Sequence, residues 1–318
     1  MASLLDLTSQ GDPATITDDA YLNRTLKLMD PQQLYELWER QQWQSQAIEL
    51  ERDKEQWAAM PEEQKDEHLW GLSSFFVGEE RVTTQFSGLV MAYENEQEEA
   101  FLTTQQVDEA RHMQFFDRYY REVLGVDHEF IQDRLAAVRV HVTDSFVELF
   151  DEHLVKAGER LIADPSDMDA KVDFVTAYHM VIEGTLALTG QHFMLDFYEK
   201  NELLPGFQEG FGNIARDEHR HVAYGTWFLQ QKCADPLMRE RVQATLNELL
   251  PIAAGVLVPK GYALGDDYEF FGYTSQEQAE FAYSALSRRL KVIGVPLGPE
   301  QPARPAAQES TSSTASAA

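Results

Sequence analysis

One short motif occurs twice in this chain and restricts its fold more than any other feature of the sequence. The run Asp-Glu-x-Arg-His ends first at His112 and again at His221. Within each run a glutamate, Glu109 or Glu218, stands three residues before the histidine. Residues three apart on an α-helix lie on one face, with Cβ atoms roughly 5–6 Å apart. Both runs therefore predict a helix that presents a carboxylate and an imidazole to the same neighbour.

Each of these runs has a candidate partner acid upstream, inside another long helical stretch. Glu79 follows the aromatic pair Phe75 and Phe76, and Glu183 lies in the largely apolar stretch 181–188. A buried carboxylate is costly unless it is paired or binds a metal. Four carboxylates and two imidazoles from four helices form the ligand set of dinuclear carboxylate sites in helical bundles, and such oxygen-rich sets suit iron and manganese. The sequence predicts six ligands: Glu79, Glu109, His112, Glu183, Glu218 and His221.

Neighbouring residues offer alternatives for two of these ligands. Glu80 could replace Glu79, but Glu79 shares an apolar helical stripe with Val82, whereas Glu80 lies off it. His219 adjoins Glu218 and points away from it, so His221 is the expected ligand.

The two acids that directly precede the ligand glutamates are Asp108 and Asp217. Metal-binding histidines usually donate their second ring N–H to such a carboxylate. We expect each aspartate to hold the imidazole of the opposite half. The alternative for both is an ordinary acid on a helix surface.

The composition limits the classes of partner. The chain has 318 residues, with 26 Lys plus Arg against 54 Asp plus Glu and a net charge of −28. Such a charge repels nucleic-acid phosphate and acidic membrane surfaces, so neither partner is expected. The single cysteine, Cys233, excludes an intrachain disulfide framework and fits a reducing compartment. No signal peptide and no run of ~18 apolar residues is visible, so we expect a soluble cytoplasmic protein.

Helical periodicity dominates the chain and predicts an all-α fold. Breakers such as Gly125, Pro165 and Pro205 separate the helical stretches. The tail from Gly298 is rich in Pro, Ala, Ser and Thr, which predicts disorder over 298–318 after a single domain over 1–297. Segment 259–275 has no clear assignment. The expected helices cover 31–44, 61–97, 99–124, 128–162, 168–200, 206–232, 236–258 and 276–292.

From about Leu34 to Pro251 the six ligand positions resemble the ribonucleotide reductase small-subunit superfamily, which implies a ferritin-like helical bundle. Typical reductase subunits store a radical on a tyrosine four residues after the first ligand histidine, and that position here is Phe116. They also carry a tyrosine in the C-terminal tail, whereas no tyrosine follows Tyr283 here. Both departures disfavour a small (beta) subunit of ribonucleoside-diphosphate reductase, which stays the alternative because manganese–iron reductases also carry that phenylalanine. A ferritin-like iron-storing protein is a third candidate.

The second branch that the chain resembles is the ligand-binding oxidases. That family has a valine three residues after the first ligand glutamate and a tyrosine five residues before the fourth ligand, which are Val82 and Tyr178 here. The resemblance implies that oxygen chemistry joins these two side chains in an ether cross-link. Five residues do not align Tyr178 with Glu183 on a regular helix, but a π-type turn would align them. The alternative for Tyr178 is an ordinary core tyrosine.

The resemblance to the oxidases also implies a set of cofactors and partners. These are a manganese–iron centre or two irons, dioxygen, and a long-chain fatty acid whose carboxylate reaches the metals. A homodimer is expected and a large reductase subunit is not. Trp43 resembles the family's tryptophan that passes electrons inward through Asp217 and His112, although it could equally pack in the core.

Overall fold

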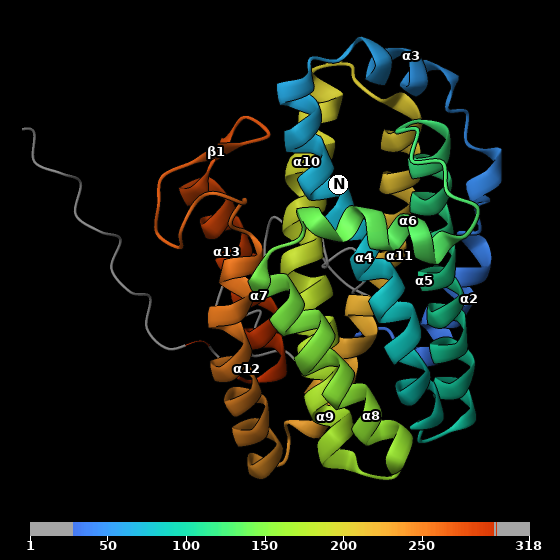
Figure 1. Cartoon of the computed structure of the whole chain (residues 1–318). Coiled ribbons are helices and arrows are strands. Elements are labelled where there is room, and N and C mark those ends of the chain that lie inside the picture. The colour runs from blue at the N-terminus through green and yellow to red at the C-terminus, as the bar shows by residue number, and fades with distance from the viewer. Residues whose placement is uncertain (1–27, 296, 298–318) are drawn as a thin grey trace, which may run out of the picture.

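The computed structural model describes residues 28–295 and 297, which form a bundle of helices (Figure 1). The α-helices are α2 Pro31–Arg40, α3 Glu51–Ala59, α4 Glu62–Met91, α5 Glu96–Glu122, α6 Ile131–Val138, α7 Asp144–Val147, α8 Val155–Ala163, α9 Met168–Val175, α10 Leu188–Lys200, α11 Pro205–Lys232, α12 Pro236–Val256 and α13 Ser275–Ile293. Short 3-10 turns are η3 Ser45–Ala47 and η4 Arg139–His141, and π-helical segments are η5 Glu148–Leu154 and η6 Thr176–Ala187. The strands are β1 Glu269–Phe270 and β2 Tyr273–Thr274.

Two helix pairs form the centre of the bundle. α4 packs along α5, and α11 packs along η6 and α10. α8 covers α4, while α12 and α13 cover η6 from the outside. The core between these helices is rich in fully buried aromatic side chains such as Phe76, Phe86, Phe116 and Tyr178. The prediction of an all-α, ferritin-like bundle is confirmed.

The helix from Met168 to Lys200 is continuous, but its middle is not an α-helix. Residues Thr176–Ala187 adopt the π form, with α9 before them and α10 after them. π-helical turns are rare and occur often at functional sites. This is the type of distortion that alignment of Tyr178 with Glu183 requires.

The long helices begin in different ways. α5 starts at Asn95, whose side chain accepts a hydrogen bond from the Glu98 N–H at 3.0 Å. α11 starts after Leu204, which has a left-handed backbone and provides no side-chain cap. Asp53 of α3 caps α11 instead, because its carboxylate accepts the N–H groups of Gly206 and Phe207, both at 2.8 Å. α3 lies across one end of the bundle (Figure 1), and the sequence did not predict it.

The prediction of one helix over 128–162 is wrong. The chain is extended at Val142, and Thr143 begins a new helix by accepting the Phe146 N–H at 3.2 Å. The unassigned segment 259–275 contains the antiparallel pair β1–β2, with Phe270 opposite Tyr273.

The structure bears only in part on the predicted disordered tail and on the predicted absence of a membrane-spanning helix. The expected tail 298–318 and the first 27 residues lie outside the described residues. Within the described part, none of the helices is both long enough and apolar enough to cross a bilayer.

Candidate metal centre

The six predicted ligands come together from four helices at the middle of the bundle. Glu79 is on α4, Glu183 is on η6, and the two Glu-x-x-His pairs are on α5 and α11. Their donor atoms form two groups in which all atoms lie within 4.8 Å of one another. One group is Glu79, Glu109, His112 and Glu218, and the other is Glu109, Glu183 and His221.

Glu109 belongs to both groups and lies between the two imidazoles. Its Oε1 is 3.0 Å from His221 Nδ1, and its Oε2 is 3.5 Å from His112 Nδ1. His221 Nδ1 is also 3.0 Å from Glu183 Oε1, and His112 Nδ1 is 3.5 Å from Glu79 Oε2. Each imidazole therefore directs the same ring nitrogen, Nδ1, at carboxylates from more than one helix.

Several donor atoms of this cluster have no hydrogen-bond partner although they are buried. They are Glu109 Oε2, His112 Nδ1, Glu183 Oε2 and Glu218 Oε2. An unpaired buried polar atom costs about 1–3 kcal/mol, and more when the group is charged. Two divalent cations, one in each group, would satisfy these atoms. The donor set therefore fits a dinuclear site of iron or manganese.

Burial shifts the pKa values of the carboxyl groups in this cluster. Burial raises the pKa of Glu218 well above its ordinary value, and the neighbouring carboxylates of Glu183, Glu79 and Glu109 raise it further. Burial likewise raises the pKa of Glu183, to about 7, and that of Glu79. Burial thus disfavours the charged form of three of the four carboxyl groups.

The groups between these acids shift in the opposite sense. Burial favours the neutral form of Glu109, but His221 and His112 together hold its pKa well below the ordinary range. Burial also opposes the charged form of both imidazoles, yet Glu79 raises the pKa of His112, and Glu109 raises that of His221, well above normal. The carboxylates and imidazoles of the cluster thus shift one another's pKa values, and bound cations would compensate the charge of the buried carboxylates.

The two aspartates hold the imidazoles across the halves. Asp217 Oδ2 is 3.3 Å from His112 Nε2, and Asp108 Oδ2 is 3.3 Å from His221 Nε2. The buried guanidinium of Arg220 joins the two aspartates, since its Nη2 donates to Asp108 at 2.8 Å and to Asp217 at 2.6 Å. An Nε2–H given to an aspartate leaves Nδ1 as the lone-pair nitrogen toward the cluster.

Each of the two aspartates also accepts a hydrogen bond from a tryptophan near the start of the described chain. Trp43 Nε1 donates to Asp217 Oδ2 at 2.6 Å, and its ring stacks on His112 with centroids 6.4 Å apart. Sequence reasoning missed a second tryptophan, Trp38, whose Nε1 donates to Asp108 Oδ1 at 2.9 Å. The sequence signal that could have indicated this contact is a second tryptophan only five residues before Trp43.

The two alternative ligands lie away from the cluster. The Glu80 carboxylate accepts the hydroxyl of Thr84 at 3.2 Å on a half-buried face, whereas Glu79 is buried. The imidazole of His219 faces the Ala215 carbonyl of its own helix. Neither side chain belongs to the two donor groups.

Tyr178 and Val82 both border the cluster. The Tyr178 hydroxyl donates to Glu109 Oε1 at 2.6 Å, and burial raises the pKa of this phenol well above normal. Val82 is buried one helical turn after Glu79. Both side chains line the same cavity as Glu79 and Glu183.

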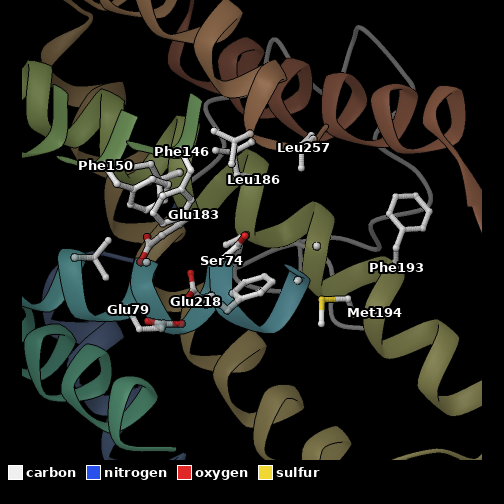
Figure 2. Close-up of a pocket in the computed structure, with 18 of the residues that line it drawn as sticks. Ser74, Glu79, Phe146, Phe150, Glu183, Leu186, Phe193, Met194, Glu218 and Leu257 are labelled. Carbon is white, nitrogen blue, oxygen red and sulfur yellow. The ribbon is translucent and has the colours of Figure 1, made fainter. Parts of the chain in front are cut away.

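This cavity contains about 850 Å³ of space, including its open part, between α4, η6, α10 and the β1–β2 segment. Figure 2 shows the carboxylates of Glu79, Glu183 and Glu218 close together, with Met194 and Phe193 farther along. Gly71, Gly78 and Gly190 also line the cavity, and a Cβ at Gly190 would lie 2.9 Å from the Phe75 ring. The result is an apolar space with an acidic end.

Comparisons with known proteins agree with this geometry. An R2-like ligand-binding oxidase with alanine in place of one valine, solved with anaerobically reconstituted Mn/Fe cofactor, is 26% identical with a TM-score of 0.72; the match covers 84% of this chain and 94% of that one. Another variant, with phenylalanine in place of a glycine, is 25% identical with a TM-score of 0.71, over 90% and 99% of the two chains. The family model for the ribonucleotide reductase small chain matches residues 24–296. The chain therefore belongs to the ribonucleotide reductase small chain family.

Proposed function

We propose that the protein is a dioxygen-activating oxidase with a dinuclear manganese–iron centre, or with two irons. The observation that carries this proposal is the convergence of unpartnered buried donor atoms at the acidic end of an apolar cavity. The similarity to R2-like ligand-binding oxidases that hold an Mn/Fe cofactor supports an oxidase over a reductase subunit.

In this proposal each donor group holds one ion. Glu79, His112 and Glu218 bind one ion, Glu183 and His221 bind the other, and Glu109 contributes to both. The aspartates fix the tautomer of the imidazoles, and the apolar walls of the cavity exclude water. When bound, the metal pair would supply the reductive activation of dioxygen and the power to oxidise a strong C–H bond.

The proposed ligand is a long-chain fatty acid or a similar amphiphile. The cavity offers apolar walls from Phe146 and Phe150 near Glu183 to Met194 and Phe193 at its far part (Figure 2). A carboxylate head would face the site where cations offset the acids, and an alkyl chain would follow the apolar wall. A homodimer without a large reductase subunit stays a prediction.

The proposed internal reaction is an ether bond between the Tyr178 oxygen and the Val82 side chain. Forming it breaks one O–H and one C–H bond, so two electrons and two protons leave the side chains and dioxygen accepts them. The hydrogen bond from Tyr178 to Glu109 supports this proposal, because it places a proton acceptor beside the phenol. Val82 supports it through its place on the same cavity wall.

The alternative, a reductase subunit, is disfavoured by the position after the first ligand histidine. Phe116 is fully buried and packs against Phe75, Phe207 and Phe211, with ring centroids 6.0–6.3 Å apart. It has no hydroxyl on which to store a radical. Robust deoxynucleotide formation with a cognate large subunit would favour the alternative.

The test is reconstitution of the reduced protein with Mn(II) and Fe(II), followed by exposure to oxygen. We expect two ions per chain, a loss of two hydrogen masses from the intact protein, and linked peptides around residues 82 and 178. Tyr178→Phe, the matched control, should bind both metals without the linkage. Unlinked peptides after full metal loading would refute the cross-link alone, whereas a protein that takes up no metal would refute the proposed function. Mass spectrometry of the organic extract identifies the ligand.

A further inference from the structure

Arg289 is a buried cation that has no acidic partner among the described residues. Its side chain, on α13, is only 3% exposed, and among the described residues it forms no ion pair. Its Nη1 donates to two backbone carbonyls, those of Gly184 and Ala285, and its Nε has no partner. Burial lowers the pKa of this guanidinium to about 9, so it still carries its charge at neutral pH. A buried unpaired charge is costly, so its position requires a structural reason.

The reason lies at the junction where η6 returns to the α form. The N–H of Leu188 donates back to the carbonyls of Glu183 and Thr185, and it passes over the carbonyl of Gly184 between them. A buried carbonyl without a donor is costly. The Gly184 carbonyl accepts a hydrogen bond from the Arg289 guanidinium, across the interface between α13 and η6.

The same junction also requires a glycine. A Cβ at Gly184 would lie 2.5 Å from the carbonyl oxygen of His179, five residues earlier, and 3.5 Å from Arg289 Nε. A side chain at this position would therefore press on the preceding turn and contact the Arg289 side chain. Glu183, the residue directly before it, is the ligand that this helix contributes.

We propose that Arg289 is a positioning residue for the half of the centre that Glu183 and His221 form. Its guanidinium fixes the π-to-α junction, and the junction fixes the Glu183 carboxylate 3.0 Å from His221 Nδ1. This inference rests on the proposed function of the cluster as a metal centre. It differs from a general packing role, because only one of the two donor groups contains Glu183.

The experiment compares Arg289→Met, which keeps an unbranched apolar stem but removes the guanidinium and its donors, with Arg288→Met, a change at the exposed neighbour. Full-length protein is titrated anaerobically with Mn(II) alone, and the affinity of each ion is measured. Arg289→Met should weaken one ion by roughly 10- to 100-fold, the usual effect of losing an outer partner of a metal ligand. The other ion and the Arg288→Met variant should match the wild type. Arg289→Lys, which keeps a donor, should recover part of the loss.

Hydrogen exchange gives a second readout that needs no metal. The amides of residues 184–189 should exchange faster in Arg289→Met than in wild-type protein. If this variant does not fold, Gly184→Ala presses on the same junction and should weaken the same single ion. Equal weakening of both ions, or unchanged affinity for both, would overturn the proposal. A wild-type protein that binds no manganese would refute the metal centre, while the exchange data would still report on the junction.

Discussion

The two halves of the centre carry the same motif on helices of different construction. α4 is a regular α-helix where it presents Glu79, whereas the helix that presents Glu183 is in the π form. The partner helices differ four residues after the ligand histidine, where α5 has Phe116 and α11 has Gly225. A Cβ at Gly225 would lie 2.2 Å from that of His179, so the π-helix approaches α11 at a point where a side chain cannot fit.

This difference explains how a repeated motif gives an asymmetric site. In the first half, the bulk of Phe116 fills the space beside α4. In the second half, the missing side chain of Gly225 admits His179, and the adjacent Tyr178 reaches Glu109. The repeat therefore supplies equivalent ligands, and the packing around it supplies a phenol on one side only.

The largest effect should come from the ligand that the halves share. Glu109→Ala removes a donor from both groups, so we expect it to abolish the binding of both ions. Glu218→Ala should also abolish the dinuclear site, whereas Glu183→Ala should leave the ion in the Glu79 group. Elemental analysis of the loaded variants measures this, with Glu80→Ala as the control that keeps both ions. Full occupancy of both positions in Glu109→Ala would contradict the assignment.

The next prediction compares how much the N-terminal caps of α11 and α5, the helices that carry the Glu-x-x-His pairs, contribute to stability. Asp53→Ala leaves the N–H groups of Gly206 and Phe207 and the Tyr119 hydroxyl without their acceptor. At about 1–3 kcal/mol per buried unpaired group, offset by removal of a buried charge, the free energy of unfolding should fall by about 3 kcal/mol. Asn95→Ala removes only the local cap of α5 and should cost about 1 kcal/mol. Urea unfolding of the metal-free variants checks this; equal losses would show that the two helix starts do not differ.

A third prediction tests the close approach at Gly225. Gly225→Ala forces His179 to move, and overpacking of this kind typically costs about 1–3 kcal/mol. In the described part of the chain, a Cβ at Gly212 of the same helix would have no atom within 4 Å apart from its chain neighbours and its own helix backbone. Gly212→Ala should therefore stabilise the protein by up to about 1 kcal/mol through helix propensity. Thermal unfolding distinguishes the two, and a neutral Gly225→Ala would show that the π-helix does not need this space.

The smallest effect is expected for substitution of the two tryptophans, which should change only the rate of electron transfer to the centre. Trp43 both donates to Asp217 and stacks on His112, whereas Trp38 donates to Asp108. Trp43→Phe should slow the reduction of the oxidised, metal-loaded protein by a soluble one-electron donor, and Trp38→Phe should leave the rate near that of the wild type. Stopped-flow absorbance measures both rates. Equal slowing of reduction in the two variants would indicate that electrons reach the centre equally through both tryptophans.

The spacing of the candidate donor residues along their helices could be predicted from the sequence more fully than the helix ends. Each Glu-x-x-His pair shares one helix face because its two residues stand three apart. The meeting of both pairs with Glu79 and Glu183 depends on how the four helices pack. The helix expected over 128–162 failed at Thr143, whose capping contact competes with helix continuation. The short helix α3 was missed because its charged sequence has little apolar periodicity, and Asp53 is buried only after α11 packs against it.

By itself, the sequence determined which donor atoms this protein has and how they are spaced, since helical periodicity is a property of neighbouring residues. Only the tertiary structure decided the features that depend on distant contacts. Asp53 accepts a capping N–H from Gly206, 153 residues later, Trp38 donates to an aspartate 70 residues away, and Arg289 donates to a carbonyl 105 residues before it. None of these pairings has a sequence period, because each depends on which helix faces meet once the bundle has formed.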